Sequence, residues 1–302
     1  MSKPNKKTKR KRIKTHYKKK HCSPKQNDLD FSCLSSDSLK ILAKALNKVV
    51  RTSNPIDYKR MDDQTLYLVI CDTMKDNYQC GSEACWIQAQ GLMRALPKQE
   101  SQYIQEHFRS MMPKTLSKDV KEWISNQEID KMLRQYHKEI NGFYYYDAAP
   151  IDFHKCSVSD ICSINLKEHL DNKEHQLGFV FNTDDSDGPG QHWIAYYVDL
   201  LSKNFEQPGI YFFDSFGSKP MKQVRDLTEK LKQQGYSLGI EFLVTHNPHS
   251  FQKNTFSCGF YCMHFLEHMI LGHKFEDYLS SWPNDKQMIQ YRNRCFIHPD
   301  EI

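Results

Sequence analysis

Several common sequence patterns are absent from this chain of 302 residues. No apolar run approaches 18 residues, so no membrane-spanning helix is predicted. The first twenty residues contain no apolar stretch, so no secretory signal is predicted. No glycine loop of the G-x-x-x-x-G-K-[ST] kind occurs, which excludes the common phosphate-binding nucleotide enzymes.

The cysteines follow no metal-finger spacing. The chain has ten of them, and without a secretory signal they indicate a reducing compartment and free thiols rather than a disulfide framework. Cys80 and Cys85 have no second pair at finger spacing, so packing thiols are expected there. Cys262, His264 and His268 would share a helix with Cys258 and could together suggest a metal site. A role for Cys258 as a nucleophile is the competing interpretation of the same residues. We therefore expect no metal and no organic cofactor.

Charge is distributed unevenly along the chain. The net charge is +5, yet residues 1–20 hold eleven Lys or Arg and no acid, and the rest carries 31 basic and 37 acidic side chains. A block of like charge repels itself, so we predict a disordered basic arm over residues 1–27. Such an arm suits nucleic acid, through counterion release, or an import receptor that recognises a Lys/Arg run. A solubilising tail is the alternative.

Residues 28–140 are predicted to form a helical N-terminal region. Asp37 can cap a helix that continues to about Val50, with leucines on one face. Ser125 and Glu128 have the spacing of a capping box at the start of a later helix. Two further helical stretches are expected at about 82–96 and 100–112.

Residues 141–302 have a different pattern, with β-rich runs between turn residues. Helices are expected over about 221–234, with Gly235 as the residue that ends the helix, and over about 258–271. The predicted strands are 178–182, 192–200, 209–213 and 239–245. The fold class predicted from this order is α+β, with the helical region added before a second core.

Three segments of this second region carry reactive side chains. His192 follows a glycine-rich turn and begins a strand, Asp214 ends an aromatic strand, and Cys258 begins a helix. Gln252 lies six residues before Cys258. Each residue alone has an ordinary structural explanation, such as a buried thiol or a turn cap. Their order and context together predict a cysteine nucleophile system.

Each of the four residues has a chemical role in that prediction. A helix N-terminus and a neighbouring imidazolium both favour the thiolate form of Cys258. His192 would transfer the proton, and Asp214 would fix its tautomer through the other ring nitrogen. The side-chain N–H of Gln252 and the backbone N–H of Cys258 would stabilise an oxyanion.

The order His-Trp, then Asp, then Gln-x5-Cys-Gly resembles the SUMO-specific and adenovirus-type protease clan. It is most similar to the cysteine proteases of large DNA viruses, of the asfarvirus and giant-virus kind. Their motif Asn-Thr-Asp-x-Ser-x-Gly-x-Gly-x-His-Trp matches Asn182–Trp193, and Cys80–Trp86 and Trp123–Asn126 also look like segments of these proteins. The resemblance covers roughly residues 60–275.

This resemblance implies a papain-like, ubiquitin-like-protein-specific protease core. By matching motif positions, His192 is the base, Asp214 the orienting acid, Cys258 the nucleophile and Gln252 the oxyanion donor. Trp193 matches a tryptophan that roofs a narrow substrate groove, under which only residues with little or no side chain can pass.

The resemblance also implies a thiol endopeptidase that cleaves viral capsid or core precursors at Gly-rich sites during virion maturation. The expected partners are these protein substrates, with nucleic acid possible through the arm. The expected locations are the virion and the infected cell, at a cytoplasmic assembly site or in the nucleus. The alternative is a deconjugating protease for SUMO or ubiquitin, although Ser257 stands where cellular SUMO proteases usually have Asp. An acetyltransferase of the same clan and an inactive nucleic-acid binder are further alternatives.

Overall fold

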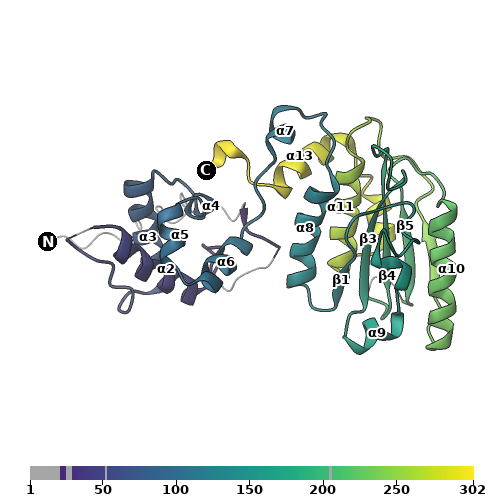
Figure 1. Cartoon of the computed structure of the whole chain (residues 1–302), viewed down its shortest axis with the longest axis horizontal. Helices are drawn as coiled ribbons and strands as arrows, with labels where there is room; N and C mark the ends of the chain where they lie inside the picture. The colour runs from purple at the N-terminus through teal and green to yellow at the C-terminus, as the bar shows by residue number, and fades with distance from the viewer. Residues whose placement is uncertain (1–20, 25–28, 52, 204–205) are drawn as a thin grey trace. The chain divides into compact units, whose positions relative to one another are not determined.

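The computed structural model describes residues 21–24, 29–51, 53–203 and 206–302 (Figure 1). The chain divides into two compact units, one of Met1–Met112 with Asn293–Ile302 and one of Pro113–Arg292. This division differs from the expected boundary at residue 140. The helix over Asn126–Glu139 packs on the first strand of the second unit, and Ile297 belongs to the core of the first unit.

The first unit is helical, as predicted. Helix α2 is capped by Ser35, whose side chain accepts a hydrogen bond from the backbone N–H of Ser38, and not by Asp37. Leu39, Leu42 and Leu46 lie on its buried face. The sequence did not predict α3. The helices are α2 (Ser36–Val49), α3 (Asp63–Tyr78), α4 (Glu83–Trp86), α5 (Gln90–Ala95) and α6 (Lys98–Glu106), with η3 (Pro299–Glu301) near the C-terminus.

The predicted basic arm falls mostly on residues 1–20, which lie outside the described residues. Residues 21–24 belong to the first unit instead of to an arm. His21 is buried, and its carbonyl accepts a hydrogen bond from the backbone N–H of Arg109 at 2.8 Å. The backbone N–H of Ser23 donates to the carbonyl of His107 at 2.9 Å.

The expectation of ten free thiols is wrong for this structure. Six cysteines form the disulfides Cys22–Cys33, Cys80–Cys85 and Cys156–Cys162. Cys71, Cys258, Cys262 and Cys295 are free. Spacings of five, six and eleven residues carry no periodic signal, so the pairs come only from the way the chain folds back on itself.

The second unit is built on a mixed sheet with the strand order β1-β3-β4-β5-β6, in which β2 also pairs with β3. Strands β3, β4 and β5 are antiparallel neighbours, whereas β1 and β6 run parallel to the strands beside them. The strands are β1 (Phe143–Tyr145), β2 (Ala149–Pro150), β3 (Gln176–Asn182), β4 (Trp193–Asp199), β5 (Gly209–Phe213) and β6 (Leu243–His246).

Helices cover both faces of this sheet (Figure 1). On one face α10 packs Val224, Leu227 and Leu231 against alternate side chains of β3, β4 and β5. On the other face α11 packs against β4 and β3. The remaining elements are α7 (Lys114–Lys118), α8 (Asn126–Glu139), η2 (Asp160–Ser163), α9 (Leu166–Asp171), α10 (Lys222–Ser237), α11 (Cys258–Ile270), α12 (Phe275–Ser280) and α13 (Asp285–Cys295).

Burial on both faces explains why these strands are apolar along their whole length. Every residue of β4 and β5 is buried. Helix α11 is buried around most of its circumference, which is why its sequence is almost entirely apolar. The predicted α+β fold class is confirmed.

Two local predictions can be compared closely with the structure. The capping box forms, with Ser125 and Glu128 each bonding the other's backbone. Gly235, however, does not end its helix, because α10 continues to Ser237. A Cβ at Gly235 would lie 2.5 Å from the ring of Phe242 and 3.0 Å from the carbonyl of Ile240. Glycine is therefore required there by a close approach of the chain and not by a helix end.

Candidate active site

Strand register brings His192 to Asp214. His192 immediately precedes β4 and Asp214 immediately follows β5. The two strands are antiparallel, with Ala195 opposite Phe213, so the start of β4 lies beside the end of β5. His192 Nε2 and Asp214 Oδ1 are 2.7 Å apart, the distance of a charge-assisted hydrogen bond.

Asp214 is buried and accepts several hydrogen bonds. Besides His192, its carboxylate accepts the backbone N–H of Phe216 at 2.9 Å and a bond from the side chain of Ser218. Burial alone would raise the pKa of Asp214, but these bonds and the charge of His192 lower it below its ordinary value. Asp214 therefore stays ionised and holds the imidazole in one orientation.

Cys258 is the first residue of α11, and its thiol is hydrogen-bonded to His192. Because Nε2 of His192 faces Asp214, Nδ1 is the ring nitrogen left for the thiol. Burial would lower the pKa of His192, but its bonds to Asp214 and Cys258 outweigh burial and raise that pKa to about 9. The Cys258 thiol therefore lies at the N-terminal end of a 13-residue helix and beside the imidazole of His192.

Gln252 is buried, and both ends of its amide are bonded. Its Oε1 accepts from the hydroxyl of Ser215 at 2.6 Å, and its Nε2 donates to the carbonyl of Asn254 at 2.8 Å. The side-chain oxygen of Asn254 accepts the backbone N–H of Ser257 at 3.0 Å. Gln252 is therefore linked through Asn254 to the residue directly before Cys258.

Trp193 and Gly259 lie next to Cys258. The indole N–H of Trp193 donates to the carbonyl of Ile124 at 3.1 Å, and Trp193 is only 7% exposed. A Cβ at Gly259 would lie 2.3 Å from Cγ2 of Ile124 and 3.2 Å from Cδ1 of Trp193. Space beside Cys258 is therefore limited by an aromatic and a β-branched side chain.

The turn that carries His192 is held by side chains whose roles the sequence did not reveal. Asn182 Oδ1 accepts the backbone N–H groups of Asp184 and Gln191, both at 3.0 Å. The carboxylate of Asp152, itself buried, accepts the backbone N–H and the hydroxyl of Ser186 at 2.9 and 2.8 Å. The resemblance to the viral motif pointed to this turn, but nothing local pointed to Asp152.

The histidines near Cys262 have other partners. His264 Nδ1 lies 3.3 Å from the hydroxyl of Tyr278, and His268 Nε2 lies 2.9 Å from the carbonyl of Lys274. Within the described ranges, no group of three or more His, Cys, Asp or Glu side chains is placed to hold a metal ion. Within the same ranges, no helix is long and apolar enough to cross a membrane.

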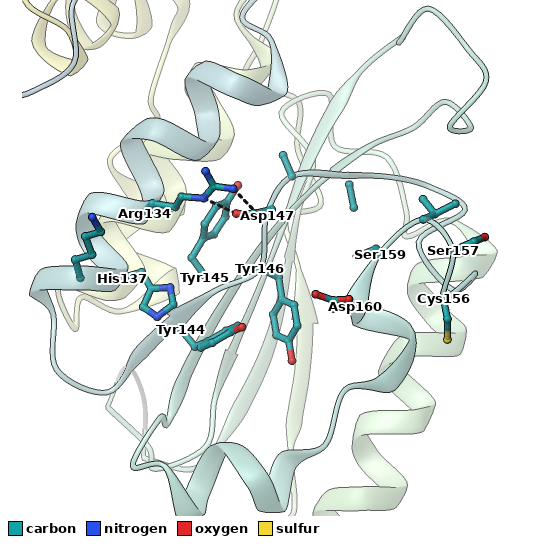
Figure 2. Close-up of a pocket in the computed structure, with 14 residues that line it drawn as sticks. Arg134, His137, Tyr144, Tyr145, Tyr146, Asp147, Cys156, Ser157, Ser159 and Asp160 are labelled. Carbon is teal, nitrogen blue, oxygen red and sulfur yellow. Dashed lines mark hydrogen bonds and ion pairs between the residues drawn. The ribbon is translucent and has the colours of Figure 1, made fainter.

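A cavity of about 560 Å³ lies between α8, β1 and the loop before η2 (Figure 2). Tyr144, Tyr146 and Asp160 line it, and an ion pair between Arg134 and Asp147 borders it. None of the four candidate catalytic residues is among its lining residues. Cys258 therefore does not line this cavity.

The fold is that of a solved viral protease, described below. A family model described as YopJ Serine/Threonine acetyltransferase matches residues 98–287, and the chain belongs to this family. The named relatives of this chain are thiol or cysteine proteases of large DNA viruses, which supports the conclusion that the chain is a protease.

Two of these relatives cover most of the chain. A putative thiol protease of Acanthamoeba polyphaga mimivirus is 27% identical over 91% of this chain and 92% of its own length. A cysteine protease of African swine fever virus is 24% identical over 74% of this chain and 85% of its own length. In another isolate of that virus the corresponding protein is named SUMO-1 cysteine protease. The predicted resemblance to viral proteases of the SUMO-protease clan is confirmed.

A solved structure agrees with the fold. The crystal structure of the African swine fever virus protease, in its selenomethionine form, superposes with a TM-score of 0.66 and 20% identity. The match covers 94% of this chain and 97% of that one. Both compact units therefore have counterparts in one known protein.

Proposed function

We propose that the protein is a cysteine endopeptidase that cleaves viral structural precursors at Gly-rich sites during virion maturation. The observation that carries this proposal is the contact of His192 with Asp214 at 2.7 Å on one side and with the Cys258 thiol on the other. The viral proteases among its relatives support the same reaction class.

The residues account for each step of peptide hydrolysis. The Cys258 thiolate attacks the scissile carbonyl carbon, and the C=O electron pair moves onto oxygen. The Cys258 backbone N–H and the Gln252 side chain donate to that oxyanion. His192 then gives its proton to the leaving amine, and an acyl-enzyme remains. Water, deprotonated by His192, hydrolyses the thioester and restores the thiol.

A preference for glycine follows from the limited space around the nucleophile. Trp193 and Ile124 both approach Gly259, next to Cys258. A substrate residue without a Cβ can lie against such a surface where a larger one would collide. We therefore assign Trp193 to substrate binding.

The test is cleavage of a candidate precursor protein and of matched peptides. One peptide set carries Gly-Gly before the scissile bond, and the other carries Ala-Ala or Val-Val. The wild type should cleave the Gly-Gly set at least tenfold faster, and Cys258→Ala should cleave neither. Equal rates for all three peptides would refute the glycine preference, and cleavage by Cys258→Ala would refute the nucleophile.

A deconjugating protease is the second candidate, because a relative is named SUMO-1 cysteine protease. The catalytic groups would be the same, so only the substrate distinguishes the two functions. The test compares the rates of cleavage of a SUMO or ubiquitin C-terminal fusion and of an internal Gly-Gly site at equal concentration. Faster cleavage of the fusion would favour the deconjugating protease.

Acetyl transfer is the third candidate, because the family description names it. The same thiolate could accept an acetyl group from acetyl-coenzyme A and pass it to a hydroxyl. Release of free coenzyme A that depends on Cys258 and on an acceptor protein would support this function. Its absence, together with peptide cleavage, would exclude it.

We also propose that residues 1–20 bind nucleic acid and hold the enzyme in the virion or at the site of assembly in the infected cell. Eleven basic residues without an acid support this proposal. Deleting residues 1–20 should reduce the salt dependence of DNA binding and the incorporation into particles. An unchanged salt slope and unchanged incorporation would contradict it.

A further inference from the structure

The amide of Gln252 has a defined orientation. Its Nε2 lies 2.8 Å from the carbonyl oxygen of Asn254. If the amide were turned around, two oxygens would face each other at this distance, so Nε2 must point to Asn254. This leaves Oε1 facing Ser215, whose hydroxyl donates to it at 2.6 Å.

Ser215 holds Gln252 by more than its hydroxyl. Its carbonyl accepts the backbone N–H groups of both Phe251 and Gln252, at 2.8 and 3.0 Å. Ser215 is fully buried and Gln252 is only 2% exposed, so water does not replace these bonds. The backbone and the side chain of Gln252 thus both bond to Ser215.

One N–H of the Gln252 amide is only weakly bonded and can be donated to the substrate. The Nε2 group carries two N–H bonds, and the bond to the carbonyl of Asn254 uses one of them. The second N–H makes a long hydrogen bond, 3.4 Å, to Oδ1 of Asn254, which a substrate oxyanion would replace. That oxygen already accepts the backbone N–H groups of Phe256 and Ser257, each at 3.0 Å.

We propose that Ser215 is a positioning residue of the oxyanion site, which aims the second, weakly bonded N–H of Gln252 at the developing negative oxygen. The proposal rests on the function proposed above. Asp214 and Ser215 are consecutive residues at the end of β5. Asp214 orients the proton carrier His192, and Ser215 orients the oxyanion donor. The residues at the end of β5 therefore position both the proton carrier and the oxyanion donor.

The experiment compares two reagents that react with Cys258. A peptide aldehyde of the acetyl-Gly-Gly-glycinal type adds the thiol to its carbonyl and forms a tetrahedral oxygen that the oxyanion site binds. Iodoacetamide alkylates the thiol by displacing iodide, with no oxyanion. The full-length protein is used in the variants Ser215→Ala, Ser215→Thr and Gln252→Ala. Ser250→Ala is the matched control, because its exposed hydroxyl donates to the backbone carbonyl of Gln252.

For Ser215→Ala we expect kcat for peptide cleavage to fall about tenfold, less than the hundredfold or more typical when an oxyanion donor is removed altogether. KM should change less than twofold. The aldehyde should bind about tenfold more weakly, while the rate and the pH profile of alkylation by iodoacetamide stay unchanged. Ser215→Thr keeps the hydroxyl and should recover part of the loss. Ser250→Ala should resemble the wild type in every assay.

The double variant Ser215→Ala/Gln252→Ala should be no slower than Gln252→Ala, because Ser215 acts through Gln252. An additional loss in the double variant would overturn the proposal. So would an unchanged kcat, or a slower alkylation in Ser215→Ala that matches the loss of kcat. A wild type that iodoacetamide alkylates but to which the aldehyde does not add would also overturn it. Aldehyde addition without cleavage of any peptide would instead refute the proposed substrate and leave Ser215 supported.

Discussion

Asn247 holds the backbone of Asp214 on both sides. Its Oδ1 accepts the N–H of Asp214 at 2.9 Å, and its Nδ2 donates to the carbonyl of the same residue at 2.6 Å. Asn247 is fully buried directly after β6, the neighbour of β5. Beyond the last backbone pair of β5 and β6, the side chain of Asn247 therefore continues the hydrogen bonding between the two segments. It does so at Asp214, which contacts His192.

Asn247→Ala should destabilise the protein by about 2–3 kcal/mol, because the N–H of Asp214 would be buried without a partner. Catalytic efficiency should fall as well, because Asp214 would lose its fixed position. Urea unfolding and peptide kinetics measure the two effects. Asn172→Ala, at an exposed position, serves as the control and should stay within about 0.5 kcal/mol of the wild type. Equal stabilities of the two variants would contradict the role of Asn247.

The pKa of His192 predicts where activity is lost at alkaline pH. This pKa is raised to about 9, so the imidazole remains protonated and able to donate to the leaving amine until the pH approaches that value. Asp214→Asn removes the negative charge and should shift the alkaline limb of kcat/KM to lower pH. A kcat/KM profile across neutral and alkaline pH measures the shift. An alkaline limb that does not move would mean that Asp214 does not set this pKa.

The same pKa has a consequence for stability. The folded-state pKa of His192 lies above its ordinary value of 6.5, so folding takes up protons between these two values. The stabilisation from charged His192 is complete below pH 6.5 and is lost as the pH rises to about 9. The stability difference between the wild type and His192→Ala, measured by urea unfolding, should therefore shrink over this interval. A difference that stays constant would contradict the raised pKa.

Gly259→Ala should lower both activity and stability. The new Cβ would lie 2.3 Å from Cγ2 of Ile124, a stiff β-branched side chain. Overpacking of this kind costs about 1–3 kcal/mol. Adding Ile124→Ala should restore part of the activity, because it removes the colliding methyl group. Gly91→Ala is the control, since nothing lies within 4 Å of its added Cβ. A harmless Gly259→Ala would show that the space beside Cys258 is not limiting.

Thiol titration tests the disulfides directly. The protein unfolded in denaturant without reductant should show four thiols, those of Cys71, Cys258, Cys262 and Cys295. After reduction the same assay should show ten. Ten thiols before reduction would instead support the expectation drawn from the sequence, in which no disulfide forms.

The sequence predicted those parts of the fold that depend on neighbouring residues. Strand β5 has the predicted bounds, because a run of apolar residues flanked by turns is a local signal. The Ser125 capping box is local in the same way. Helix α3 escaped prediction because its apolar residues form an unbroken run from Leu66 to Cys71, which does not mark one face of a helix.

The candidate site shows the same limit. The sequence placed His192, Asp214 and Cys258 at strand and helix ends, where reactive groups can meet, and Gln252 six residues before Cys258. It gave no reason to choose Asn247 or Asp152, since each acts on a residue more than 30 positions away. Such contacts follow from strand order and register, which local patterns do not contain.

Asp152 holds the turn that precedes His192 in place through hydrogen bonds. Its buried carboxylate accepts two hydrogen bonds from Ser186 and one from Lys155, at 3.0 Å. Burial would raise the pKa of Asp152, but these bonds lower it below its ordinary value. The stabilisation from these hydrogen bonds is therefore complete at pH values above the ordinary pKa of an aspartate. It is lost as the pH falls through the lowered pKa of Asp152.

Asp152→Ala should free this turn and lower kcat/KM about tenfold or more, because a small displacement of His192 disturbs the contact with Cys258. Iodoacetamide labelling of Cys258 should slow in parallel, since the variant perturbs the thiolate–imidazolium pair itself. Ser186→Ala, which keeps the backbone bond at 2.9 Å, should show a smaller loss of the same kind. If Asp152→Ala labels Cys258 at the wild-type rate, the turn does not depend on Asp152, and its other hydrogen bonds, among them those of Asn182, hold His192 in place.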